Sequence, residues 1–139
     1  MKAFDFRLSK VLEYRQLTEQ WAKDAYLDAR AARLEAETVL LGILTLKQQL
    51  LTHVALTIED MQATELRFQT LDDRESEQRL VINVLADEEG KALADWKERR
   101  QEVAALEKLH DRAYEEWTHL MSKEEQAFLD EWTNSRRAA

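Results

Sequence analysis

The residues of this chain that could do chemistry are three histidines and many carboxylates. No two of His53, His110 and His119 are four residues apart, the spacing that places two metal ligands on one helix face. Glu107 and His110 have the Glu-x-x-His spacing found in di-metal carboxylate bundles, but such a centre also needs further inward-facing glutamates on packed helices. The histidines therefore do not indicate a metal site.

The carboxylates do not indicate an acid–base pair either. Glu88 and Glu89 are adjacent, as are Glu115 and Glu116, and adjacent residues of a helix point about 100° apart. The sequence also lacks an HExxH motif, a glycine-rich phosphate loop and a GxSxG motif. We therefore expect a protein that is not an enzyme and that binds no cofactor and no metal.

The composition favours long helices over sheets. The 139 residues include no proline, no cysteine and only two glycines, and 35% of them are charged. Tight turns between strands need glycine and proline, whereas long solvated helices are rich in charged residues. Without cysteine there is no disulfide framework and no thiolate chemistry.

Charge and hydropathy limit the partners. A net charge of -8 at pH 7 argues against nucleic acid, because phosphates attract cationic surfaces. The longest apolar run, residues 39–44, is far shorter than the roughly 20 residues of a membrane span, and residues 1–10 lack the apolar core of a signal peptide. We therefore expect no nucleic acid partner and no membrane insertion. The lack of cysteine is compatible with the cytosol. We expect the chain to be a monomer or a weak homodimer.

A heptad pattern runs through the first third of the chain. Steps of four and three residues predict one helix of a coiled coil over about residues 4–52. All but two of the positions on this predicted seam are apolar: Phe4, Leu8, Val11, Arg15, Thr18, Ala22, Ala25, Ala29, Ala32, Ala36, Val39, Ile43, Leu46 and Leu50.

A second heptad register covers the rest of the chain, and its phase differs from the first by one residue. It runs through Met61, Thr64, Phe68, Leu71, Glu75, Gln78, Ile82, Leu85, Glu89, Ala92, Trp96, Arg99, Val103, Leu106, His110, Ala113, Trp117, Leu120, Glu124, Ala127 and Glu131. The phase therefore breaks between about residues 50 and 60.

This break is explained either by a four-residue stutter in one helix or by a reversal of the chain. Thr57, followed by Glu59 and Asp60, resembles a helix N-terminus, because a threonine can cap the helix and carboxylates favour its first turn. This favours a turn at about 53–57 and a second helix over about 58–134. The polar stretch 72–76 is a second candidate for the turn.

The predicted fold is all-α: a long antiparallel two-helix coiled coil, or helical hairpin, forming a single unit over residues 1–139. A tight reversal sets Leu46 opposite about residue 63 and Leu8 opposite about residue 101, with Trp96 beside Val11 and Leu12. The first helix is then used up near residue 105, so the longer C-terminal helix projects beyond it. Four polar residues on the seam are interpreted as setting the register or reaching solvent: Arg15, Gln78, Arg99 and His110.

The segment 107–132 combines dense charge with large apolar residues at helical spacing: Trp117, Leu120, Phe128 and Trp132. In the predicted hairpin no helix of the same chain lies beside this segment. An exposed aromatic stripe on a helix indicates an interaction surface. We therefore expect these residues to contact an outside partner or a second copy of the chain.

Both ends of the chain resemble the FliJ family, the stalk proteins of the bacterial flagellar export apparatus. Residues 4–16 are similar to its N-terminal signature at Phe6, Arg7, Leu8, Lys10, Leu12 and Arg15. Residues 105–132 are similar to its C-terminal signature at Leu106, Glu107, Lys108, Leu109, Arg112, Gln126, Leu129 and Asp130. Residues 95–101 resemble the run that precedes this second motif.

The resemblance implies a cytoplasmic stalk, peripheral to the inner membrane, that inserts its terminal ends into the hexameric flagellar export ATPase. It also implies contacts with the export gate membrane protein and with export chaperones. The ATPase-binding residues would then be Phe4, Phe6, Leu8, Leu12, Trp117, Leu120, Phe128 and Trp132. Where the family has paired aromatics this chain offers only Phe68 and Leu71, so no gate-binding residues are assigned. The alternatives are a self-associating structural coiled coil and the equivalent stalk of a type III injectisome.

Overall fold

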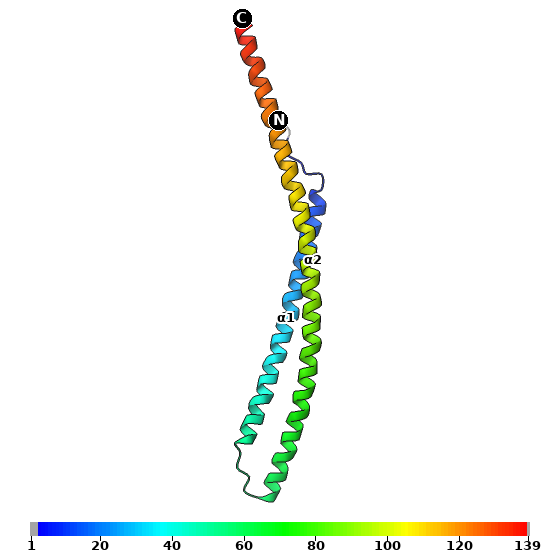
Figure 1. Ribbon diagram of the computed structural model, residues 1–139, viewed down its shortest axis with the longest axis vertical. Coiled ribbons are helices and arrows are strands. Elements are labelled where there is room, and N and C mark those ends of the chain that lie inside the picture. The colour runs from blue at the N-terminus through cyan, green and yellow to red at the C-terminus, as the bar shows by residue number, and fades with distance from the viewer. Residues whose placement is uncertain (1–2, 139) are drawn as a thin grey trace. The chain divides into compact units, whose positions relative to one another are not determined.

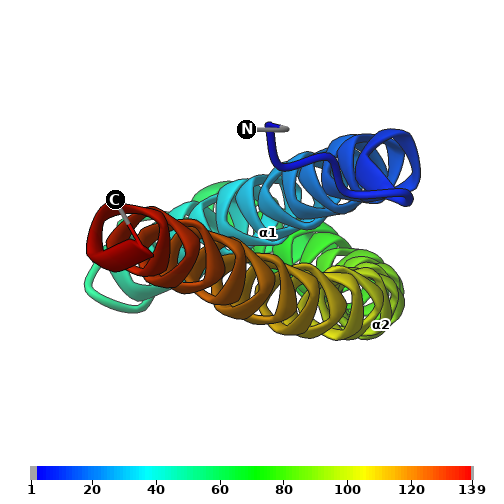
Figure 2. The ribbon, with the colours of Figure 1, turned by 90° about the horizontal axis from the view of Figure 1, so that it is seen from above.

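The computed structural model describes residues 3–138, which form two helices, α1 (Ser9–Leu51) and α2 (Ile58–Ala138), and no strand (Figure 1). The chain divides into two compact units, one made of Met1–Gln20 with Lys97–Ala139 and the other of Trp21–Trp96. In the second unit, α1 (cyan) and α2 (green) lie side by side in both views (Figure 1 and Figure 2). The predicted all-α helical hairpin is thereby confirmed.

The first helix begins later than the sequence pattern suggests. Residues 3–8 are not helical, and α1 begins at Ser9, whose backbone N–H donates to the carbonyl oxygen of Phe6 at 3.1 Å. In this segment Phe4, Phe6 and Leu8 are covered, while the residues between them are exposed. Such alternation is typical of an extended chain lying on a surface.

The chain reverses in the loop 52–57, and α2 is capped at its start. The Oγ1 of Thr57 accepts a hydrogen bond from the backbone N–H of Asp60 at 3.0 Å, and the Thr57 carbonyl accepts one from Met61 at 3.0 Å. Glu59 and Asp60 lie in the first turn, where carboxylates interact favourably with the helix dipole. Because α2 is uninterrupted over 72–76, the chain does not turn at that second candidate position.

The predicted seam of α2 is confirmed over its central part. Every predicted position from Thr64 to Trp117 is buried or half-buried. Outside that range, Met61 at one end and Leu120 at the other are exposed.

The predicted seam of α1 is correct at ten of its fourteen positions, which are buried or half-buried. One position per heptad is correct, including the buried residues Ala22 and Ala36. At the other position Thr18 and Ala32 are half-buried, but Val11, Ala25, Val39 and Leu46 are exposed, and the residue that follows each of these four is half-buried instead. The observed seam is Leu8, Leu12, Arg15, Glu19, Ala22, Tyr26, Ala29, Arg33, Ala36, Leu40, Ile43, Lys47 and Leu50.

Contacts across the seam give the pairing of the helices in the unit Trp21–Trp96. Tyr26 stacks on Trp96 with ring centroids 5.6 Å apart, so the predicted position of Trp96 beside Val11 and Leu12 is wrong. Seven residues farther along α1, Arg33 forms an ion pair with Glu89, which is seven residues before Trp96. Equal steps in opposite directions are the signature of an antiparallel coiled coil in constant register.

The pairing is offset by more than ten residues from the predicted one. Lys47 would lie opposite about residue 62 in a tight hairpin, but it forms ion pairs with Asp72 and with Glu75. The cause is the loop 52–57, which carries the chain past the end of α1 before α2 begins (Figure 1). The first turns of α2 therefore have no α1 residue opposite them.

Candidate partner-binding surface

An aromatic cluster joins the N-terminal segment to α2. The ring of Phe4 lies edge-on to His110 and Tyr114, with centroids 5.4 and 5.2 Å away, and 5.8 Å from the ring of Trp117. Phe6 is only 9% exposed and lies edge-on to His110 at 5.2 Å. Edge-to-face geometry at these distances is favourable for aromatic pairs. The cluster fixes residues 3–8 on α2.

This cluster extends the covered part of α2 beyond the predicted limit. The expectation that no part of the same chain lies beside the segment 107–132 is wrong for the start of that segment, because Phe4 contacts Tyr114 and Trp117. Two causes act together: the loop offset moves α1 along α2, and the segment before Ser9 follows α2 without being helical.

The far part of α2 carries a second, open set of apolar side chains, which we call the C-terminal stripe: Leu120, Phe128 and Trp132. These side chains are 57%, 65% and 52% exposed, respectively. At 100° per residue they lie with Trp117 within an arc of about 120°, the width of one helix face. The guanidinium of Arg136 lies 4.7 Å from the centroid of the Trp132 ring.

The structure thus divides the eight predicted binding residues into two groups. Phe4, Phe6 and Trp117 contact one another or a shared neighbour, and Leu8 and Leu12 are half-buried beside them in sequence. The three residues of the C-terminal stripe are open to solvent. Their role in binding an ATPase stays a prediction.

Sequence reasoning missed a groove at the loop end of the second unit. It has a volume of about 550 Å³ and an apolar floor that includes Leu46, Leu50 and Leu71. Arg67 and Arg74 also line it. The shifted phase of α1 creates this groove, because it turns Leu46 away from the seam. The sequence signal that could have revealed this groove is an apolar residue next to a charged seam residue, as Leu46 is next to Lys47.

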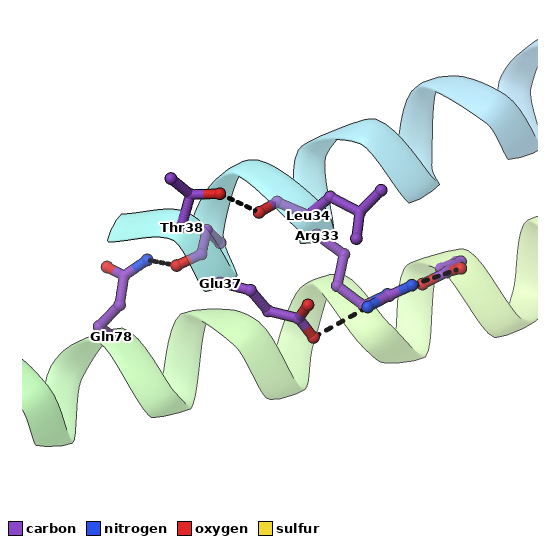
Figure 3. Close-up of polar contacts among 7 residues, drawn as sticks. Arg33, Leu34, Glu37, Thr38 and Gln78 are labelled. Atoms are coloured by element: carbon purple, nitrogen blue, oxygen red, sulfur yellow. Dashed lines mark hydrogen bonds and ion pairs between the residues drawn. The ribbon is translucent and has the colours of Figure 1, made fainter. Parts of the chain in front are cut away.

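Charged and polar groups cross the seam at several positions. Arg33 forms ion pairs with Glu89 and, at 2.8 Å, with Glu37, and these two acceptors raise the pKa of its guanidinium above the ordinary value. Figure 3 shows Gln78 reaching the backbone of α1, where its Nε2 donates to the carbonyl oxygen of Ala36 at 2.8 Å. In the other unit, Arg15 forms an ion pair with Glu102 at 3.0 Å.

A second charged layer lies nearer the loop. Hydrogen bonds to Asp72 and Glu75 raise the pKa of Lys47. The pKa of Glu75 is lowered, first by its hydrogen bond from Lys47 and second by the one from Arg79. The predicted role of polar seam residues in setting register is consistent with these contacts for Arg15 and Gln78, which both reach across to the other helix.

The histidines and carboxylates form no metal centre in the described range. No group of three or more potential ligands gathers anywhere in residues 3–138. His110, the partner of Glu107 in the Glu-x-x-His spacing, packs against Phe4 and Phe6. Glu116 and His119 have the same spacing, and both are exposed.

Comparison with known proteins gives one match over nearly the whole chain. The model of the family described as "Flagellar FliJ protein" matches residues 4–139. The chain belongs to the FliJ family. Members of the FliJ family are stalk proteins of flagellar protein export, so the resemblance at both ends of the sequence is confirmed. Comparisons with curated proteins and with solved structures found no match.

Within residues 3–138, neither α1 nor α2 contains a stretch that is long and apolar enough to cross a membrane.

Proposed function

We propose that this protein is the stalk of a flagellar export machine and that its C-terminal stripe binds inside the central cavity of the hexameric export ATPase. The observation that carries the proposal is the exposure of three large apolar side chains on one helix face in a FliJ-family chain. Clustered apolar and aromatic residues in a polar surface are typical of helix-in-groove recognition. The role is one of binding and coupling, not of catalysis.

The charges around the stripe support a polar rim at this contact. Glu124, Glu125, Asp130 and Glu131 are exposed on the same segment. Exposed charges at an interface rim steer association and select orientation more than they add affinity. We therefore expect association with the ATPase to slow as ionic strength rises.

The other proposed partners of the stalk rest on the role of the FliJ family in flagellar protein export. We propose that it couples the ATPase to the export gate membrane protein, meets export chaperones, and works in the cytoplasm at the inner membrane. The groove lined by Arg67, Leu71 and Arg74 is open at the loop end and offers a surface for such a contact. The family match favours the flagellar system over an injectisome.

The test is binding of the purified hexameric ATPase by a Phe128→Ala plus Trp132→Ala variant. Truncation of an interface aromatic costs about 2 kcal/mol at a hot spot, so the affinity should fall on the order of a hundredfold or more. Trp21→Ala is the matched control, because Trp21 is 58% exposed but lies in the other unit. Helicity by circular dichroism should be the same in all three proteins.

An unchanged affinity in the double variant, with helicity retained, would contradict this assignment of the site. Self-association through the stripe is the competing function. A dimer that persists to nanomolar concentration in light scattering, and that the double variant abolishes, would support it instead.

A further inference from the structure

The non-helical segment 3–8 is attached to α2 by side chains rather than by its backbone. Within the described residues, its backbone hydrogen bonds go only to the start of α1: Ser9 to Phe6, and Leu12 to Leu8. The contacts with α2 are ring contacts of Phe4 and Phe6. A segment held in this way can leave α2 without breaking backbone hydrogen bonds between the two.

The tryptophan that Phe4 contacts, Trp117, carries an unsatisfied polar group. The indole Nε1 of Trp117 is buried and has no hydrogen-bond partner within the part of the chain that the structure describes. A buried donor without an acceptor is costly, because it has lost its bond to water and gained none in return. The state in which the segment covers Trp117 is therefore less stable than it would be if this donor had an acceptor.

The same tryptophan is continuous with the open binding surface. Trp117 lies on the helix face that carries Leu120, Phe128 and Trp132, but Phe4 covers it while these three are exposed. The face thus has one covered end and one free end.

We propose that residues 3–8 form a strap that covers Trp117 in the free protein and is released when a partner binds the C-terminal stripe. The partner would place an apolar side chain where Phe4 lies, and next to it a hydrogen-bond acceptor for the Trp117 indole. A carboxylate or the free carbonyl of a helix C-terminus has the required chemistry. This inference rests on the proposed function, because the partner it requires is the export ATPase.

The first experiment tests the strap in the protein alone. Replacing Trp21, Trp96 and Trp132 by phenylalanine leaves Trp117 as the single tryptophan, which is excited at wavelengths that tyrosine does not absorb. In this background, Phe4→Ala should make Trp117 more accessible to quenching by acrylamide. Tyr14→Ala should not, because Tyr14 is an exposed aromatic of the same unit that α1 directs to solvent. Equal quenching with and without Phe4 would overturn the strap.

The second experiment tests release, with the otherwise unaltered chain and the hexameric ATPase. The apparent dissociation constant is the intrinsic one divided by the fraction of open molecules. If about one molecule in ten is open, Phe4→Ala should tighten binding about tenfold. Unchanged or weaker binding of Phe4→Ala would overturn the proposal, because Phe4 would then be either irrelevant or part of the interface.

The two experiments separate the two hypotheses. If neither the parent protein nor Phe4→Ala binds the ATPase, the proposed function fails, and release by that partner fails with it. The quenching result then still decides whether the segment covers Trp117.

Discussion

Replacing Leu71 tests whether the seam, rather than intrinsic helix propensity, stabilises the hairpin. Leu71 is 8% exposed and is one of the few buried residues among those described, whereas Leu80, also in α2 and in the same unit, is 66% exposed. Leu→Ala costs about 2–5 kcal/mol at buried sites. Because Leu71 lines an open groove, partial collapse is possible and we expect about 2–3 kcal/mol.

The corresponding shift in melting temperature follows from chain size. An unfolding entropy of about 2.1 cal/mol/K per residue gives about 0.3 kcal/mol/K for a chain of this length, so Leu71→Ala should lower Tm by about 7–10 °C. Leu80→Ala makes the same change in helix propensity but should change the free energy of unfolding by no more than about 0.5 kcal/mol. Thermal unfolding followed by circular dichroism measures both. Equal shifts for the two variants would refute the role given to the seam.

Two further predictions concern pH and the helix cap. Because the pKa of Glu75 is lowered in the folded protein, the ionised carboxylate stabilises the fold above pH 4.5, its ordinary pKa. This stabilisation is lost as pH falls through the lowered pKa. The Tm of the parent protein should therefore fall in acid, and Glu75→Gln should make that fall smaller. The raised pKa of Lys47 acts in the opposite range, with stability present below about pH 10.5 and lost above it. Thr57→Ala removes the acceptor for the Asp60 N–H and should lower the free energy of unfolding, measured in urea, by about 1 kcal/mol. Thr57→Ser keeps an acceptor and should change it little. Equal losses of stability in the two variants would argue against the cap.

The register of α2 could be predicted from sequence because its seam persists over many heptads. The register of α1 could be predicted only in part, because its apolar residues and its seam residues coincide at some positions and not at others. Val39 and Leu46 look like seam residues in isolation, whereas Arg33 and Lys47 look like surface residues. Arg33 and Lys47 occupy the seam because α2 supplies Glu89 and Glu75 opposite them, and one helix's sequence does not show what faces it.

The candidate site was predicted in part for a similar reason. The aromatic spacing of the C-terminal stripe is visible in the sequence, and its residues are exposed as expected. The coverage of Trp117 depended on how many residues the loop adds between the helices, and heptad patterns carry no information about that length. The buried indole Nε1 of Trp117 and the contact of its ring with Phe4 follow from the loop offset rather than from any local motif.

The charged seam layers also determine which helices can pair when two chains meet. In the unit Trp21–Trp96, α1 contributes the cations Arg33 and Lys47, and α2 contributes the anions Glu89 and Glu75. Two copies of α1 placed side by side in parallel register would oppose cation to cation, and two copies of α2 placed in the same way would oppose anion to anion. An exchange of helices between chains, by contrast, keeps every α1 on an α2 and leaves the ion pairs intact. We therefore expect the charged layers of this unit to disfavour pairing of like helices and to leave domain swapping unopposed.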